Sequence, residues 1–295
     1  MPITTTEAAD AIPEVLMVDV LDYLRDRLVL ARMVRRDMRD AVSAKGDKIG
    51  VPKLGDLSVQ EPAEGDPLTF ASPSNSKVIV DLDKDPSVTW SVTSKARAVA
   101  IDEALDYGKQ AIGRLGGHIE AALAGLYTEA TTEVGTGGTA VTTSTLLDAW
   151  EALEAANVPD DMRFAAVAVK DAKNLLDTDK LTKVNESGDQ GAALRRAQLG
   201  ALYGMDIFSS NKIVSTAGPV FHGMAGHRDG ITLAIRPLEL PDAGVVASVI
   251  TDEESGLSFR LMRSYDIDTK STKFVLDLLY GVKMVDPRLM VEILS

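Results

Sequence analysis

The chain has 295 residues, of which 45% are hydrophobic and 25% charged, a composition typical of a globular protein with a large core. It contains no cysteine, which excludes disulfides, cysteine-ligated zinc and thiol nucleophiles. The net charge of −13 disfavours nucleic-acid binding through overall charge, without excluding a local basic patch. No basic region precedes an apolar run at the start, and no stretch reaches the roughly 18 apolar residues of a membrane span. We therefore expect a cytoplasmic protein that does not enter the membrane.

The first segment, residues 1–45, is expected to be helical, at least in part, from Glu14 to Asp40. Apolar residues recur there at steps of three and four, which is one stripe of a helix. The stripe consists of Leu16, Val20, Leu24, Leu28 and Ala31. Arginines and aspartates are mixed in the same stretch, which is typical of a solvated face, with contact to an acidic partner as the alternative. The arginines are Arg25, Arg27, Arg32, Arg35, Arg36 and Arg39.

Residues 46–92 predict a long extended excursion. Five of the twelve prolines fall here, and proline confines strands to edges and turns. Val88, Trp90 and Val92 alternate with polar residues, which is the period of a strand. The segment has too few apolar residues for its own core, and isolated two-stranded ribbons are marginal in water. We expect it to pack against its own body or against another copy, through residues that include Leu68, Phe70, Val88 and Trp90.

From 96 to 130 the apolar positions change to helical spacing, and Glu120 falls among the residues assigned to the polar side. About 30 residues would make a rod of roughly 45 Å. Each of the four glycines in this stretch should lower helix stability by about 1 kcal/mol relative to alanine. Either tertiary packing compensates for this loss or the rod bends. Residues 133–144 are then expected to be a flexible break.

Residues 140–250 alternate between helix and strand signals, which indicates a mixed α/β domain. The expected elements are a helix ended by Asn157–Pro159, a buried strand at 163–170 and a short helix from Asp171. A polar loop, a helix ending near Gly200 or Gly204, and a strand at 205–210 come next. Two extended pieces around a glycine-rich turn complete the domain at 219–235.

The end of the chain returns to strand spacing. Apolar residues occupy six successive alternate positions from Phe274 to Met284, an apolar face of roughly 33 Å. Only the predicted rod matches that length, so the two should pack together. Asp286–Pro287 interrupts the strand, which Leu289, Val291 and Ile293 resume.

Residues able to carry chemistry are few. His118, His222 and His227 lack the spacing and companions of a metal site. The glycine-rich GTGGT from Gly135 matches no phosphate loop, and no G-x-S-x-G elbow occurs, although a Ser-His-Asp arrangement stays open. Aromatic residues, at 5%, are too few for a base-stacking platform. We therefore predict no enzyme, no metal and no cofactor.

The order of these parts resembles the major capsid proteins of tailed bacteriophages, with the Hong Kong 97-like fold. AADAIPEVLMVDVLDYLRDRLVLARMV looks like the N-terminal arm of that family, and GDKIGVPKLGDLSV like the start of its extended loop. LGALYGMDIFSSNKI and VFHGMAGHRDGITLAIRPLEL are similar to its turn and strand-pair motifs. The match is closest for GLSFRLMRSYDIDTKSTKFVLDLLYGVKMVDPRLMVEIL. The resemblance, taken with the order of the parts, extends over essentially the whole chain.

The resemblance implies an α+β fold in five parts. They are an N-terminal arm (1–45), an extended β-hairpin loop (46–92), a peripheral domain with a long spine helix (93–138), an α/β axial domain (139–260) and long return strands of the peripheral domain (261–295). The last run would close the sheet of that domain. Contacts between subunits are expected at Leu68, Phe70, Val88, Trp90, Leu16, Val20, Leu24, Arg35 and Arg36.

The implied function is a coat protein that self-assembles into hexamers and pentamers of an icosahedral virion shell in the bacterial cytoplasm. The shell would enclose double-stranded DNA without sequence-specific binding. A separate scaffolding protein, a portal and a decoration protein are the expected partners, and no crosslinking between subunits is expected. The alternatives are a non-viral shell of the same fold (an encapsulin or a gene-transfer-agent capsid), a tail or decoration protein, and a soluble α/β enzyme with its site on the 140–260 loops.

Overall fold

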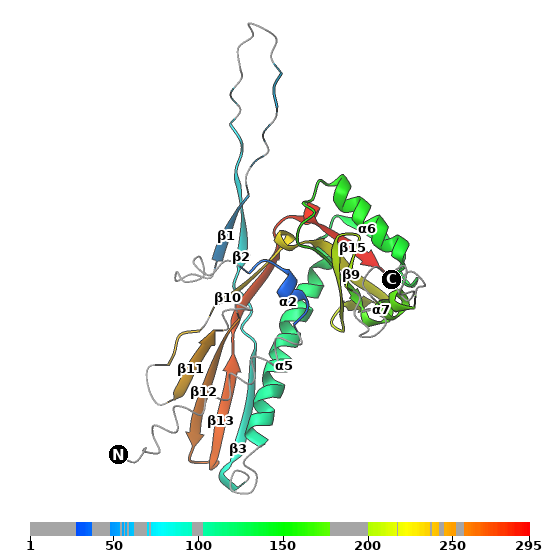
Figure 1. The fold of residues 1–295 in the computed structure, drawn as a ribbon. Coiled ribbons are helices and arrows are strands. Elements are labelled where there is room, and N and C mark those ends of the chain that lie inside the picture. Colours follow the sequence, from blue (N-terminus) through cyan, green and yellow to red (C-terminus); the bar gives the residue numbers. More distant parts are fainter. Residues whose placement is uncertain are drawn as a thin grey trace, which may run out of the picture.

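The chain builds three parts that Figure 1 shows in one view: a projecting two-stranded ribbon, a sheet beside a long helix, and an α/β unit. The computed structural model describes residues 28–36, 48–53, 55, 57, 59–61, 70, 72–95, 103–177, 200–216, 218–236, 238–241, 245–251 and 257–295. Within these ranges no helix is both long and apolar enough to span a membrane.

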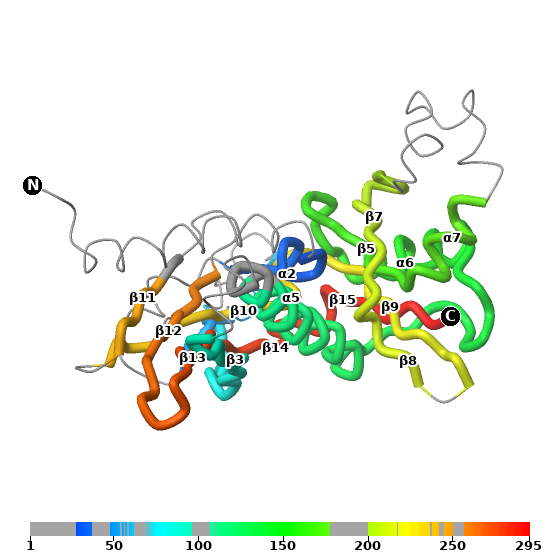
Figure 2. Tube along the Cα trace, turned by 90° about the horizontal axis from the view of Figure 1, so that it is seen from below, coloured from blue at the N-terminus to red at the C-terminus, as the bar shows by residue number. Residues whose placement is uncertain are grey.

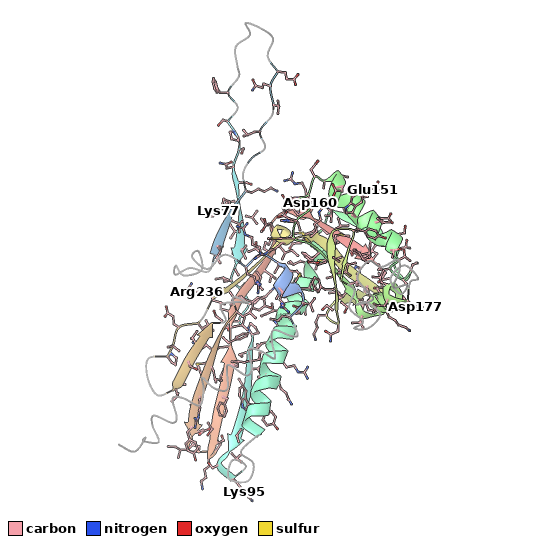
Figure 3. All side chains as sticks on the ribbon, viewed as in Figure 1. Lys77, Lys95, Glu151, Asp160, Asp177 and Arg236 are labelled. Carbon is pink, nitrogen blue, oxygen red and sulfur yellow. The ribbon has the colours of Figure 1, made fainter. Side chains whose placement is uncertain are left out.

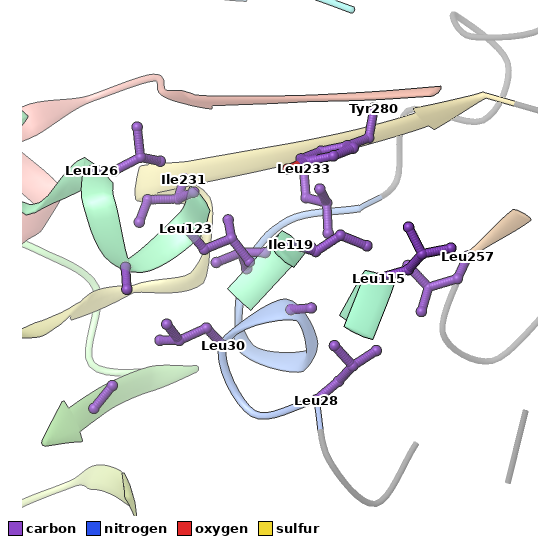
Figure 4. Close-up of a cluster of buried hydrophobic side chains, with 14 of the residues drawn as sticks. Leu28, Leu30, Leu115, Ile119, Leu123, Leu126, Ile231, Leu233, Leu257 and Tyr280 are labelled. Carbon is purple, nitrogen blue, oxygen red and sulfur yellow. The ribbon is translucent and has the colours of Figure 1, made fainter. Parts of the chain in front are cut away.

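The rod is helix α5, Glu103–Ala124, which a 3₁₀ turn, η1 at Gly125–Glu129, continues. Its 22 residues make about 33 Å of helix, and residues 96–102 of the predicted rod lie outside the described ranges. Leu115, Ile119 and Leu123 are buried at helical spacing and face Leu233 and Tyr280 across the main core (Figure 4). The predicted packing of the rod on the C-terminal apolar face is therefore confirmed.

A four-stranded antiparallel sheet lies along the rod in the order β11 (Val246–Thr251), β12 (Ser258–Asp266), β13 (Ser271–Asp277) and β3 (Ser87–Thr93). Trp90 stacks on Phe274 with ring centroids 5.2 Å apart, and both pack into the main core. Residues 87–92 thus belong to this sheet and not to the extended excursion expected for 46–92. The reason is that the apolar face of Val88 and Trp90 is buried by the chain's own rod.

The ribbon is the antiparallel pair β1 (Lys48–Lys53) and β2 (Ser76–Asp81), which projects from the body of the molecule (Figure 1). Its base lies on a second antiparallel pair, β10 (Ile231–Arg236) and β14 (Leu279–Met284). The predicted long strand at 274–284 is therefore two strands, β13 and β14, which separate at Leu278 and join different sheets.

The α/β unit contains a seven-stranded sheet with the order β4, β15, β9, β5, β7, β6, and β8 pairs with β9. Its helices are α6 (Thr143–Ala155) and α7 (Val169–Leu176). Ala165 and Val167 of β5 face these helices, whereas Phe164 and Ala166 face the main core beside the rod. The strands are β4 (Thr132–Gly135), β5 (Arg163–Ala168), β6 (Ala201–Leu202), β7 (Met205–Ser210), β8 (Val214–Thr216), β9 (Val220–His227) and β15 (Met290–Leu294).

Three predictions for this region are wrong. The C-terminal run does not close the sheet beside the rod: β15 lies inside the α/β sheet, between β4 and β9. The expected flexible break at 133–144 contains strand β4, which pairs in parallel with β15. A helix ending at Gly204 is excluded, because residues 201–204 form β6 and a turn. In each case pairing with a strand distant in sequence decides the conformation, and local periodicity does not report such pairing.

The glycine-rich turn expected at 219–235 is displaced within its segment. Gly223 and Gly226 lie inside β9, and the chain turns instead at η2, Arg228–Gly230. A β-carbon on Gly226 would come within 2.4 Å of the Leu289 carbonyl oxygen. The glycine therefore allows β9 to approach η3 (Pro287–Leu289) and β15 closely.

The N-terminal segment contributes a single helical turn, α2 at Leu30–Met33, in the described range 28–36. Leu28 and Ala31 are buried in the main core, which confirms the end of the predicted stripe. Helix then gives way to extended chain. The Arg35 N–H donates to the Ile231 carbonyl oxygen (3.0 Å), and the Arg35 carbonyl accepts from the Leu233 N–H (2.9 Å). Figure 2 shows α2 lying beside α5.

Candidate interaction surfaces

The base of the ribbon is fixed to the body by a small apolar core. Ile49, Val51 and Val80 are buried there against Ala234. Just beyond β2, the chain exchanges two backbone hydrogen bonds with Tyr280 through Lys84, at 3.1 and 2.9 Å. These contacts determine the direction in which the ribbon leaves the body.

A glycine is required where the ribbon base meets β14. A β-carbon at Gly281 would lie 2.0 Å from the carbonyl oxygen of Asp81, closer than side-chain carbons approach any backbone atom. Any larger residue at position 281 would therefore push the end of β2 away from β14.

An ion pair joins β1 to the turn that precedes β15. The Lys53 ammonium lies 3.2 Å from Asp286, whose carboxylate also accepts from the Arg288 guanidinium at 2.9 Å. The hydrogen bond from Arg288, assisted by Lys53, lowers the pKa of Asp286 to about 2. The Asp286 carboxylate therefore stays charged at neutral pH and holds both basic side chains.

Beyond its base the ribbon presents apolar side chains to solvent. Val59 is 91% exposed and Phe70 92% exposed, and Leu57 is exposed as well. The Gly55 N–H donates to the Asn75 side-chain oxygen at 3.1 Å, which links the two arms just beyond the paired strands. We call Leu57, Val59 and Phe70 the ribbon tip. No described residue of the same chain buries it, so these side chains are available for contact with another molecule.

The predicted contact residues divide into three groups. Phe70 is free to meet a partner. Val88 and Trp90 are half-buried against the rod of the same chain. The backbone of Arg35 is hydrogen-bonded to β10, and the neighbouring Arg36 is half-buried. The remaining four predictions lie outside the described residues: Leu16, Val20, Leu24 and Leu68.

A buried carboxylate on the rod anchors the N-terminal segment, and sequence analysis missed it. Glu120 is only 2% exposed, although it was assigned to the polar side of the rod. Its two carboxylate oxygens accept from the backbone N–H groups of Leu30 and Ala31, each at 3.0 Å. Burial raises the pKa of Glu120, and these backbone hydrogen bonds oppose the rise. No local pattern signals this role, because it depends on chain 90 residues away.

The three histidines serve internal contacts. His222 Nδ1 lies 2.5 Å from the buried Glu292 carboxylate, and its ring stacks on Tyr127 at 4.2 Å, which links η1 to the α/β sheet. His118 Nδ1 lies 2.7 Å from the Tyr280 hydroxyl, and His227 lies 3.5 Å from Asp161. Among the residues that the structure describes, no group of three or more His, Cys, Asp or Glu side chains could hold a metal ion.

Comparison with known proteins gives no match to a protein-family model and none to a curated protein. Solved structures do match. A structure from Mycobacterium phage Che8 is 21% identical, with a TM-score of 0.68 over 90% of this chain and 91% of that one. The capsid of the cyanophage P-SCSP1u is 14% identical, with a TM-score of 0.62 over 90% and 87%. A virus-like particle from Pyrococcus furiosus is 12% identical, with a TM-score of 0.56 over 95% and 98%.

These similarities cover nearly the full length of both chains in each comparison. The chain therefore has the α+β, Hong Kong 97-like fold of phage capsids, as the sequence resemblance implied.

Proposed function

We propose that this chain is the major capsid protein of a tailed bacteriophage. Copies assemble into hexamers and pentamers of an icosahedral shell that encloses double-stranded DNA without reading its sequence. One observation carries the proposal: about 90% of the chain, and not one domain of it, follows a capsid fold, and its ribbon has an exposed apolar tip. Burial of these apolar side chains against another copy would remove them from water, which favours assembly.

The parts of the molecule take matching roles in this proposal. Residues 1–45 are the N-terminal arm, which Glu120 anchors to the rod of its own subunit. The ribbon, with the chain between its strands, is the extended loop that reaches a neighbouring subunit. The rod and the four-stranded sheet form the peripheral domain, and the α/β unit is the axial domain near the five-fold and six-fold positions.

Assembly is driven by many contacts of modest strength. Full burial of a side chain such as Phe70 contributes about 1.5–3 kcal/mol, so a single ribbon tip binds weakly. In a closed shell the ribbon tip of each subunit packs against one neighbour, and the subunit itself contacts the ribbon tip of another neighbour. The same contact is repeated for every subunit of the shell. Misplaced subunits can then dissociate before closure, while the complete shell is stable.

The proposal extends to partners and place. The shell is part of the virion and is assembled in the host cytoplasm, with a separate scaffolding protein, a portal and a decoration protein as partners. Subunits are held by non-covalent contacts, and the chain has no catalytic role. A non-viral shell is the second candidate, because the virus-like particle from Pyrococcus furiosus is similar over 98% of its own length.

Electron microscopy of the purified protein tests the proposal directly. We expect closed shells, alone or with a candidate scaffolding protein, and nuclease-resistant DNA inside shells isolated from infected cells. Shells that contain only protein cargo would favour the non-viral candidate. A protein that stays monomeric by analytical ultracentrifugation under all these conditions, with residues 48–81 resistant to protease, would refute both.

A further inference from the structure

Helix α6 presents an acidic outer side. Its thirteen residues contain no lysine or arginine. Asp148 and Glu151 are exposed, and neither has a basic partner among the described residues. The third acid, Glu154, is already paired with Arg163 at 2.8 Å. Asp148 and Glu151 are therefore exposed carboxylates with no ion pair to any residue that the structure describes.

Helix α7 presents the opposite charge. Lys170 and Lys173 are exposed, and within the described ranges no ion pair joins either to a carboxylate; the Lys170 ammonium lies 5.8 Å from the centre of the Phe221 ring. The acid inside this helix, Asp171, is buried and accepts from the Val141 N–H at 3.2 Å. Asp177, just past the helix end, is an exposed acid. The outward side of α7 is therefore basic along its first turns.

Both outer sides also expose apolar residues. On α6, Leu147 is 38% exposed and Trp150 39% exposed, one helical turn apart. On α7, Val169 is 55% exposed beside Lys170. Tryptophan is the residue type most enriched at the energetic centres of interfaces, which makes Trp150 the natural anchor of a contact. We call Leu147, Asp148, Trp150 and Glu151 the α6 surface, and Val169, Lys170 and Lys173 the α7 surface.

The two surfaces lie at different positions on one unit. Both helices cover the same face of the seven-stranded sheet, where their apolar residues share a core. However, α6 contacts β4 and β15, whereas α7 contacts β5 and β7. Figure 3 labels Glu151 on α6 and Asp177 at the end of α7, at separate places on the unit. Two different, complementary surfaces on one molecule produce head-to-tail contacts, which close into rings when the rotation between copies permits.

We propose that the α6 surface of one copy binds the α7 surface of the next copy in a head-to-tail ring. Asp148 and Glu151 then pair with Lys170 and Lys173 of the neighbour, and Leu147 and Trp150 cover its Val169. The inference rests on the proposed function and specifies which surfaces hold the hexamers and pentamers together. Charge complementarity selects a second copy as the occupant, because the same chain supplies both signs.

A charge swap tests the pairing. Glu151→Lys and Lys173→Glu each place like charges in contact, and each should lower the association constant of the ring about tenfold at low salt. The double variant restores opposite charges and should return to within about twofold of the wild type. Asp206→Lys is the matched control. Asp206 is exposed on β7, and its neighbours Met205 and Ile207 face the core under α6 and α7, so Asp206 lies on the opposite face of the sheet from the two surfaces. This charge reversal should leave the association constant of the ring unchanged. Double variants no better than the single ones would overturn the pairing.

Engineered disulfides give an independent test in a chain without cysteine. In the full chain carrying both Leu147→Cys and Val169→Cys, mild oxidation during assembly should give a ladder that reaches five or six subunits on denaturing gels. Either single variant should stop at dimers or monomers. If shells form without the ladder, the α6–α7 contact is refuted and the capsid proposal stands. If no assembly forms under any condition, the capsid proposal fails, and the ring contact fails with it.

Discussion

Replacement of Glu120 by alanine should release the N-terminal segment from the rod. The change leaves two buried backbone N–H groups, those of Leu30 and Ala31, without acceptors. A buried donor without a partner costs about 1–3 kcal/mol, so the two together predict a loss of about 2–6 kcal/mol. We take about 3 kcal/mol as the expected value, because a truncated side chain can admit water to one of the two groups.

Glu120→Gln is the informative control for this prediction. Glutamine keeps one carbonyl acceptor and carries no charge, so it loses one hydrogen bond and avoids the cost of burying a carboxylate. Burial raises the pKa of Glu120, which means that the folded protein favours the neutral form of this side chain. The stability of this site is therefore greatest below the ordinary glutamate pKa and falls as pH rises through the raised one. At neutral pH, Glu120→Gln should cost only about 1 kcal/mol.

Two measurements check the reasoning about Glu120. Urea denaturation gives the free energy of unfolding for wild type and both variants, and limited proteolysis reports the release of residues 28–36. We expect alanine to lose more stability than glutamine, and cleavage within 28–36 to appear only in the alanine variant. Equal losses for the two variants, or an alanine variant with wild-type protease resistance, would show that Glu120 does not hold the segment.

Three further predictions concern the ribbon. Phe70→Ala should leave the unfolding free energy of the monomer unchanged within about 0.5 kcal/mol, because Phe70 is 92% exposed. The same variant should lower the assembled fraction measured by sedimentation. Unchanged assembly would contradict the proposed contact of Phe70 with a neighbouring subunit. Gly281→Ala should destabilise the chain by at least about 2 kcal/mol, because the added β-carbon would meet the Asp81 carbonyl oxygen. Gly108→Ala should instead stabilise the chain by up to about 1 kcal/mol, because no atom lies near the added β-carbon in helix α5. Thermal unfolding of both variants measures the difference. The pKa of Asp286 is lowered to about 2, so the contribution of this carboxylate to folding stability should be complete above the ordinary aspartate pKa and should disappear as pH falls toward 2. In acid unfolding, Asp286→Asn should therefore lose less stability than the wild type over this pH range.

The rod and the C-terminal strands could be predicted because their signals are local. Leu115, Ile119 and Leu123 repeat at helical spacing, and the face from Phe274 to Met284 repeats at strand spacing. Each pattern reports which side of an element is buried. Neither reports which sheet a strand joins, so the division at Leu278 and the insertion of β15 into the α/β sheet were not visible.

The candidate surfaces were predictable only in part, because local patterns do not show which distant segment covers a given side chain. Phe70 is exposed, whereas Trp90 is half-buried because it packs into the core beside the rod and stacks on Phe274; the sequence alone does not show which of the two the chain itself covers. The role of Glu120 depends on backbone groups 90 residues away along the chain. Such roles come from long-range pairing, which single-sequence patterns do not encode.

The base and the tip of the ribbon differ in how completely the chain itself covers them. Its base has every feature of a finished structure: a buried apolar core, paired strands, an ion pair to Asp286 and a glycine fitted to its neighbour. Among its described residues, the tip has no buried apolar core and no ion pair. A rigid base that directs an apolar tip away from the body reduces the entropy lost when the tip binds. If the proposed function holds, a firmly attached ribbon with an exposed apolar tip suits a shell whose individual contacts are weak.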